Sequence, residues 1–163
     1  MSRPRKNHSP EGAAATSLVL ELFRLNGALL AAGDQLLGGL GLTSARWQVM
    51  GAIALADAAL PVAHIARNMG LTRQAVQRVA DDLADAGIVG YARNPHHRRA
   101  KLVLLTARGR ALYAEADARQ APWINRLAAG IAARRLTETA ETVRLLRERL
   151  EAAKPPAQPK RGT

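Results

Sequence analysis

The stretch "PVAHIARNMGLTRQAVQRVADDLADAG" (residues 61–87) contains two segments with apolar side chains at helical spacing, separated by one glycine. The first segment follows Pro61 and is broken by Gly70, a residue type that commonly ends helices. Thr72 can then cap a second helix, which runs to Gly87. The stretch therefore predicts a helix, a tight turn and a second helix, which is the helix-turn-helix arrangement.

The second helix of this motif is polar and cationic where it begins and acidic where it ends, from Asp81 onward. Its long polar side chains are spaced so that they share one exposed face. In the DNA major groove, Arg can bind guanine O6 and N7, and Gln can bind adenine N6 and N7. Phosphate would repel the acidic end, so we expect that end to point away from a duplex. The candidate DNA-contacting residues of this helix are Thr72, Arg73, Gln74, Gln77 and Arg78.

A polar segment between two apolar runs follows the helix-turn-helix directly. Residues 88–91 and 102–105 form the runs and flank Asn94-Pro95, which predicts a β-hairpin. All charged side chains between the runs are positive, so the hairpin is a basic wing whose tip can enter the minor groove. A solvated amphipathic helix would explain the polar helix alone, but it would not explain the helix together with a basic wing. The candidate wing contacts are Arg93, His97, Arg98, Arg99 and Lys101.

The composition narrows the classes of fold, partner and chemistry. The Ala- and Leu-rich chain favours helix, and its periodicities predict a mainly α fold with six helices and one β-hairpin. With 163 residues and a net charge of +11, it suits one domain with an anionic partner: nucleic acid, anionic lipid or an acidic protein. It has no cysteine, which excludes disulfides, thiolate nucleophiles and cysteine–zinc sites. We find no metal-ligand spacing, phosphate-binding glycine loop or nucleophile–base arrangement, and therefore expect no metal, no cofactor and no enzymatic activity.

The two ends of the chain and its first helix carry further signals. Residues 1–14 are basic and polar and residues 153–163 are basic and Pro-rich, so we expect both to be disordered tails. We find neither an apolar run of membrane-spanning length nor a signal peptide, and therefore expect no membrane partner and a cytoplasmic location. The apolar stripe of the helix over about residues 16–38 is wider than one small core requires, which suggests a second surface such as a partner subunit.

The chain resembles the MarR family of winged-helix regulators over nearly the whole predicted domain. The stretches that carry the resemblance are "LPVAHIARNMGLTRQAVQRVADDLADAGIVGY" (60–91) and "NPHHRRAKLVLLTARGRAL" (94–112). The family's wing is similar to Asp-Pro-x-Asp-x-Arg, an apolar strand and Leu-Thr-x-x-Gly. Arg99 matches the wing arginine, whereas Asn94 and His97 stand at the two acidic positions. Because an Asp there can hold the wing arginine, the resemblance implies a looser wing tip in this chain.

The resemblance also implies an assembly and a mode of action. It implies a homodimer that binds a pseudo-palindromic operator, with recognition helices about 34 Å apart. It implies a sequence-specific regulator, most often a repressor, that a small lipophilic or phenolic effector releases from DNA. The expected MarR-like domain covers 15–152, with dimerisation helices at about 16–38 and 107–151, a winged helix-turn-helix at about 43–106, its helix-turn-helix at 62–87 and its wing at 88–105.

Two residues are candidates for an effector pocket, and one rival function stays open. Trp47 lies on a predicted helix where the family's pockets form, although a core tryptophan is the simpler interpretation. Asn26 interrupts the apolar face of the first helix, which a dimer contact would explain equally well. A constitutive architectural DNA-binding protein of low specificity, with no effector, would use the same fold. The two functions differ in preference for one site over random DNA, which is about 10³-fold or more for a regulator.

Overall fold

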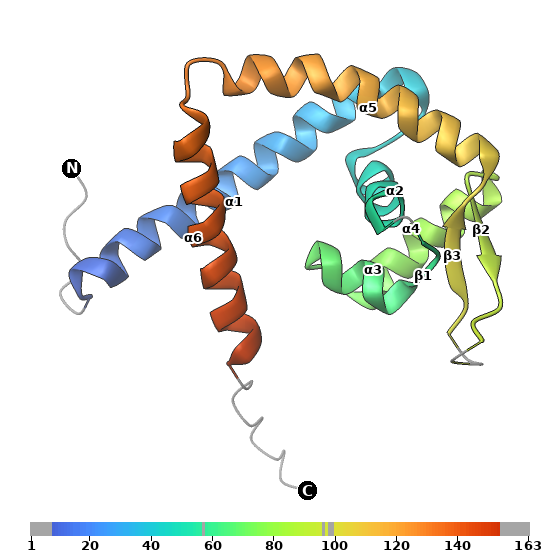
Figure 1. The fold of residues 1–163 in the computed structure, drawn as a ribbon, viewed down its shortest axis with the longest axis horizontal. Helices are drawn as coiled ribbons and strands as arrows, with labels where there is room; N and C mark the ends of the chain where they lie inside the picture. The colour runs from blue at the N-terminus through green and yellow to red at the C-terminus, as the bar shows by residue number, and fades with distance from the viewer. Residues whose placement is uncertain (1–7, 57, 96, 98–99, 154–163) are drawn as a thin grey trace, which may run out of the picture. The chain divides into compact units, whose positions relative to one another are not determined.

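The computed structural model describes residues 8–56, 58–95, 97 and 100–153. Within them, the chain forms six α-helices and a small antiparallel sheet, which confirms the predicted mainly α fold (Figure 1). The chain divides into two compact units, residues 1–122 and 123–163. The elements are α1 (Pro10–Leu37), the 3₁₀ turn η1 (Gly38–Leu40), α2 (Ser44–Ala56), β1 (Leu60–Pro61), α3 (Val62–Met69), α4 (Arg73–Asp85), β2 (Val89–Ala92), β3 (Leu102–Leu105), α5 (Ala107–Ala128) and α6 (Ala133–Ala152).

The hydrophobic core of the first unit joins α2, α3 and α4 to the sheet and to the end of α1. Full burial stabilises a side chain of this size by roughly 1.5–3 kcal/mol relative to leaving it exposed. The core therefore fixes the orientation of the helix-turn-helix against the sheet. Fully buried side chains from five elements are Leu37 of α1, Met50 of α2, Ile65 of α3, Leu83 of α4 and Val103 of β3.

The turn between α3 and α4 forms as the sequence predicts. Gly70 has a φ of 63°, in the left-handed region, and its N–H donates to the carbonyl groups of Ala66 and Arg67. Thr72 caps α4, because its side-chain oxygen accepts a hydrogen bond from the Ala75 N–H at 3.2 Å. These two local features separate the helices and confirm the helix-turn-helix.

The sheet has three strands in the order β1-β3-β2, whereas the sequence predicted only the β2–β3 hairpin (Figure 1). β3 pairs with β1 through Leu60↔Val103 and Pro61↔Leu102, and it pairs with β2 through Tyr91↔Val103 among others. A strand of two residues has no periodicity, which is why the sequence pattern did not reveal β1. Because β1 leads directly into α3, the extra strand ties the helix-turn-helix to the wing.

Helix α1 begins earlier than predicted. The Ser9 side chain accepts a hydrogen bond from the Gly12 N–H at 3.1 Å, and Pro10 is the first helical residue. Both features favour a helix start. Residues 10–14 are therefore helical rather than part of a disordered tail. The outer parts of both predicted tails lie outside the described residues.

Helix α1 together with η1 is long and apolar enough to cross a membrane, by length and composition alone (Pro10–Leu40). The expectation that no such segment exists was therefore wrong by this criterion. The end of α1 nevertheless packs in the first unit, where Leu37 is fully buried. Ser44 Oγ donates to the Leu30 carbonyl at 2.7 Å, and the Ser44 N–H donates to Asp34 Oδ1 at 2.6 Å. These contacts fix the start of α2 against α1.

The second unit contains the end of α5 and helix α6. Within residues 123–153, no side chain of α6 is buried, and Leu136 and Leu150 are exposed. An ion pair one turn apart, Arg134–Glu138 at 2.6 Å, lies on its surface and contributes about 0.3–0.5 kcal/mol. Val143 and Leu146 are half-buried, and the other apolar side chains of α6 are exposed.

Candidate nucleic-acid interface

Helix α4 presents its polar face because its opposite face is anchored in the core. Val76 and Leu83 are fully buried. Arg73, Gln74 and Arg78 lie on the other side, near the start of the helix, and all three are exposed. Within the part of the chain that the structure describes, Arg73 and Arg78 make no hydrogen bond or ion pair. Their guanidinium donors are therefore available to a ligand.

Thr72, the first of the predicted contacts, is exposed but already has a structural role. Its hydroxyl oxygen accepts the Ala75 N–H and so begins α4. The hydroxyl proton is not needed for this bond and can still be donated to an acceptor such as phosphate oxygen.

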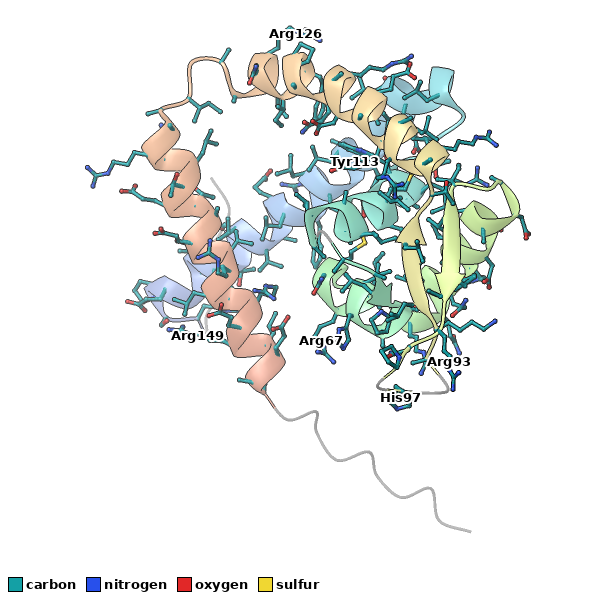
Figure 2. The ribbon with its side chains drawn as sticks, turned by 45° about the vertical axis from the view of Figure 1, so that its right-hand side comes forward. Arg67, Arg93, His97, Tyr113, Arg126 and Arg149 are labelled. Atoms are coloured by element: carbon teal, nitrogen blue, oxygen red, sulfur yellow. The ribbon has the colours of Figure 1, made fainter. Side chains whose placement is uncertain are left out.

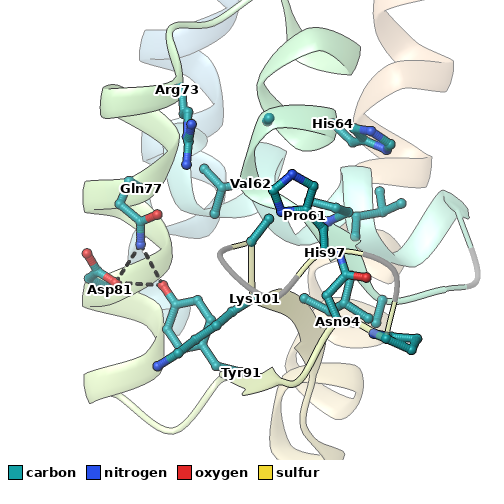
Figure 3. Close-up of a pocket in the computed structure, with 16 residues that line it drawn as sticks. Pro61, Val62, His64, Arg73, Gln77, Asp81, Tyr91, Asn94, His97 and Lys101 are labelled. Carbon is teal, nitrogen blue, oxygen red and sulfur yellow. Dashed lines mark hydrogen bonds between the residues drawn. The ribbon is translucent and has the colours of Figure 1, made fainter.

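Gln77 is held in a hydrogen-bond network with Asp81 and Tyr91 (Figure 3). Gln77 Nε2 donates to Asp81 Oδ1 at 2.9 Å and to Tyr91 Oη at 3.0 Å. Tyr91 Oη in turn donates to Asp81 Oδ1 at 2.6 Å. The amide nitrogen of Gln77 is therefore already engaged within the protein, and the role of Gln77 as a DNA contact stays a prediction. Asp81, at the acidic end of α4, faces the wing across this network, and its orientation relative to a duplex stays a prediction.

The protonation state of Tyr91 keeps this network intact. Burial first, and then the hydrogen bond to the Asp81 carboxylate, raise the pKa of Tyr91 to about 12. The phenol is therefore protonated at neutral pH and continues to donate to Asp81. The ammonium of Lys101, next to β3, lies 5.8 Å from the centre of the Tyr91 ring, within cation–π range. The network thus connects α4 with both sides of the wing.

An open cavity of about 1110 Å³ lies between α4, the junction of β1 with α3, and the wing. Arg73 and Gln77 line it from α4, His64 lines it from α3, and His97 and Lys101 line it from the wing (Figure 3). The structure thus brings four of the predicted DNA contacts to one hollow surface. The lining also contains the Asp81 carboxylate and apolar side chains, so it is the basic and hydrogen-bonding groups at its edge that suit a polyanionic ligand.

The described part of the wing tip carries two predicted contacts, Arg93 and His97, and both are exposed. Figure 2 shows both side chains at the same end of the hairpin. Asn94 is buried between them, and its carbonyl accepts the His97 N–H at 3.4 Å. Arg98 and Arg99, the other predicted wing contacts, lie outside the described residues.

The base of the wing is braced by the residues that follow β3. Arg108 Nη1 donates to the Ala86 carbonyl at 2.9 Å, and Arg110 Nη1 donates to the Leu105 carbonyl at 2.7 Å. Thr106 Oγ1 donates at 2.8 Å to a main-chain carbonyl in the turn after α4. These side chains hold the wing by main-chain contacts.

A second pocket, of about 580 Å³, lies beside α2 in the same unit. Its lining includes Trp47, Leu55, Met69 and Tyr113. The indole nitrogen of Trp47 is buried and has no hydrogen-bond partner among the described residues. Asn26, the other predicted pocket residue, is exposed on α1 and is not part of this lining.

Sequence reasoning missed three residues of these sites: Asp81 as a network partner, Tyr91 and Tyr113. Tyr91 lies 14 residues after Gln77 and 10 after Asp81. No spacing rule joins such positions, because their contact depends on how the wing folds back on α4. Tyr113 occurs within a helical pattern, where an aromatic residue usually indicates core packing.

The sequence matches a known family and resembles chains from mycobacteria. The sequence profile of the MarR family matches residues 40–100. The uncharacterised protein Rv2011c of Mycobacterium tuberculosis is 37% identical over 138 residues, which cover 85% of this chain and 95% of the relative. The uncharacterised protein Mb2034c of Mycobacterium bovis shows the same identity and coverage. The similarity therefore extends well beyond the helix-turn-helix.

Solved structures share the fold over most of their length. A transcriptional regulator (MarR family) from Rhodococcus sp. RHA1 is 25% identical with a TM-score of 0.71, over 81% of this chain and 93% of that chain. CouR from Rhodococcus jostii RHA1, bound to p-coumaroyl-CoA, is 26% identical with a TM-score of 0.70, over 77% and 87%. The transcriptional regulator BldR from Sulfolobus solfataricus shares the fold at 19% identity, with a TM-score of 0.75 over 83% and 96%.

Proposed function

Because the chain belongs to the MarR family of winged-helix transcriptional regulators, we propose that it is a sequence-specific repressor. We further propose that it acts as a homodimer and binds a pseudo-palindromic operator. One observation carries the proposal: Arg73, Gln74 and Arg78 are exposed in the first half of a helix that lies beside a basic wing. Arg and Gln at the start of a recognition helix can read base edges, while a basic wing contacts the adjacent backbone and minor groove. Such a regulator works in the cytoplasm, where the DNA is.

The proposed homodimer is supported by apolar side chains that the single chain leaves exposed. Phe23 on α1 is 70% exposed and Leu150 on α6 is 77% exposed. A second copy is a better occupant for α1 than a membrane, because Glu21 and Arg24 form an ion pair on that helix and the helix end packs in the core. A two-fold dimer requires an operator whose half-sites are related by the same symmetry.

A promoter fusion tests the repressor role. The DNA upstream of the protein's own gene is placed before a reporter, and expression is compared in cells with and without the protein. Repression predicts higher reporter output without the protein, and loss of that difference when an inverted repeat in the promoter is scrambled. Lower output without the protein would indicate an activator, and equal output would contradict control of this promoter.

Arg99→Ala is expected to weaken binding by about 1 kcal/mol or more, and most at operators with A·T-rich flanks. The reason is that a narrow, A·T-rich minor groove attracts an inserted arginine. Fluorescence anisotropy with two operators that differ only in their flanks measures the effect. Arg144→Ala, an exposed position on α6, is the control for charge. Equal losses on both operators would contradict minor-groove insertion.

We also place a small lipophilic or phenolic effector in the pocket beside α2. The pocket has two aromatic walls, Trp47 and Tyr113. Nε1 of Trp47 is buried and unpartnered among the described residues, and an acceptor on a ligand that reached it would satisfy this donor. CouR, which shares the fold, was solved with p-coumaroyl-CoA, an aromatic thioester with such acceptors.

Trp47→Phe tests this pocket by removing the indole donor while keeping an aromatic side chain. Titration calorimetry with p-coumaroyl-CoA and with p-coumarate is expected to show binding that is weakened about fivefold, the loss of one hydrogen bond of about 1 kcal/mol. Trp123→Phe, a tryptophan outside the pocket lining, is the matched control. Equal weakening in both variants, or no binding by the native protein, would contradict the assignment of this pocket to phenolic ligands.

A further inference from the structure

We propose that Asp81 and Tyr91 orient the amide of Gln77 so that only its carbonyl oxygen faces the DNA, and that Gln77 thereby selects a base with an exocyclic amine. This inference rests on the proposed function, because it assigns a specificity to one residue of the recognition helix. Gln77 would touch the base, whereas Asp81 and Tyr91 would act as positioning residues.

The two hydrogens of the Gln77 amide already have acceptors within the protein. Nε2 lies 2.9 Å from Asp81 Oδ1 and 3.0 Å from Tyr91 Oη. A primary amide carries two N–H donors, and each can be directed at one of these acceptors, although the 2.6 Å between the two acceptors makes both bonds bent. The carbonyl oxygen Oε1 is the part of the side chain that stays free for a ligand.

The orientation of this amide follows from the chemistry of its neighbours. An ionised carboxylate can only accept, so the amide atom beside Asp81 Oδ1 must be the nitrogen. The Tyr91 proton is given to the same Oδ1 at 2.6 Å, which leaves the phenol oxygen to accept from Gln77. If the amide turned over, Oε1 would face the Asp81 carboxylate oxygen, and the Tyr91 hydroxyl could donate to Oε1 only by giving up its hydrogen bond to Asp81.

The positioning residues are themselves held in place. Asp81 lies one turn after Gln77 on α4, beside the buried Ala80. Tyr91 pairs with Val103 across the two wing strands, and its ring lies under the Lys101 ammonium. The Gln77 amide is therefore hydrogen-bonded both to the helix, through Asp81, and to the wing, through Tyr91.

The free oxygen faces the surface where the duplex is expected. Figure 3 shows the Gln77 nitrogen turned to Asp81 and Tyr91 and its oxygen turned away from them, on the cavity that Arg73 and His97 also line. In the major groove, an acceptor matches the exocyclic amine of adenine (N6) or cytosine (N4). It does not match the acceptors of guanine (O6, N7) or thymine (O4). A free glutamine would instead bind adenine through two hydrogen bonds.

The test uses the full-length protein and a library of duplexes with a randomised centre. After selection, binding is measured on duplexes that carry each base at each position, and Gln77→Ala identifies the position that Gln77 reads. At that position the native protein is expected to prefer A or C over G or T by about tenfold. The base preference is a ratio of two affinities of the same variant, so an effect of charge or stability that weakens binding to every duplex equally does not change it.

Two variants then change the base preference in different ways. Tyr91→Phe frees one amide hydrogen, so adenine is expected to gain about fivefold over cytosine as a second hydrogen bond forms to N7. Asp81→Asn provides a neighbour that can donate, so the amide can turn over and the discrimination against G and T should fall to about twofold or less. Asp85→Asn is the matched control, because this exposed residue of α4 makes no hydrogen bond within the described residues and its change alters the charge equally.

The outcomes separate this inference from the proposed function. If the native protein selects a site and both variants keep its base preference, or lose affinity equally for all four bases, the inference is wrong and the proposed function stands. If the native protein selects no sequence, both are wrong. If Asp85→Asn changes the preference as Asp81→Asn does, charge rather than the hydrogen-bond network is responsible, and the inference is again contradicted.

Discussion

Replacing Arg73 and Arg78 together with alanine is expected to weaken binding to the selected operator by about 100-fold or more. Each is an exposed guanidinium in the first half of α4 without a partner in the described structure, so each can contact a base edge or a phosphate. An arginine contact to guanine is worth about 1–3 kcal/mol, and the proposed dimer presents each arginine twice. Fluorescence anisotropy on the operator and on a mismatched duplex measures the loss and its dependence on sequence.

The control for this variant removes the same charge from another surface. Arg134→Ala with Arg144→Ala alters two exposed arginines of α6 and lowers the net charge equally. Because neither lies on the helix-turn-helix or the wing, we expect less than about a threefold loss of affinity, within the range usual for surface charges. A similar loss in both double variants would show that total charge, and not the face of α4, determines binding. If the double variant loses the same affinity for the operator and for the mismatched duplex, α4 does not contact bases specifically.

Gly109→Ala is expected to lower the melting temperature by about 10 °C. A Cβ at this position would lie 2.0 Å from the carbonyl oxygen of Ile88 and 3.1 Å from its carbonyl carbon. Both atoms are main chain and the carbonyl is already bonded to the Thr106 N–H at 3.1 Å, so they cannot give way as a side chain would. Overpacking of this kind costs about 3 kcal/mol, and each kcal/mol shifts the melting temperature of a chain of this size by about 2–4 °C.

Calorimetry or circular dichroism of the two glycine variants checks this result. Gly38→Ala is the matched control, because Gly38 has helical backbone angles and a Cβ there would meet no atom within 4 Å. We expect the control to melt within about 2 °C of the native protein. If Gly109→Ala also melts close to the native protein, the first turn of α5 can move away from the start of β2. The close packing at the base of the wing would then not limit the size of the side chain at position 109.

The helix-turn-helix could be predicted because its signals are local. Gly70 ends one helix and Thr72 begins the next, and both effects act within a few residues along the chain. The β2–β3 hairpin was predicted for the same reason, from two apolar runs around Asn94-Pro95. Strand β1 could not be predicted, because two residues carry no pattern and their pairing with β3 is set by the tertiary fold.

The site was predicted less completely than the fold, and the reason is again the range of the interactions. The helical period of the sequence predicts that Arg73 and Arg78 are exposed, because it places the apolar side of α4 in the core. The period cannot show that Gln77 is bonded to Tyr91, 14 residues later, because that contact depends on the angle of the wing. Helical spacing places Asp81 one turn after Gln77, but charge alone suggested that it should avoid the interface.

A competition measurement tests the DNA-binding function most directly. The purified full-length protein is bound to a labelled duplex that carries the inverted repeat upstream of its gene, and unlabelled operator or random duplex is added at fixed salt. We predict that about 10³-fold more random DNA than operator is needed to displace the label. Equal displacement by both duplexes would indicate a protein of low specificity, and no binding to either duplex at low salt would contradict the proposed function as a whole.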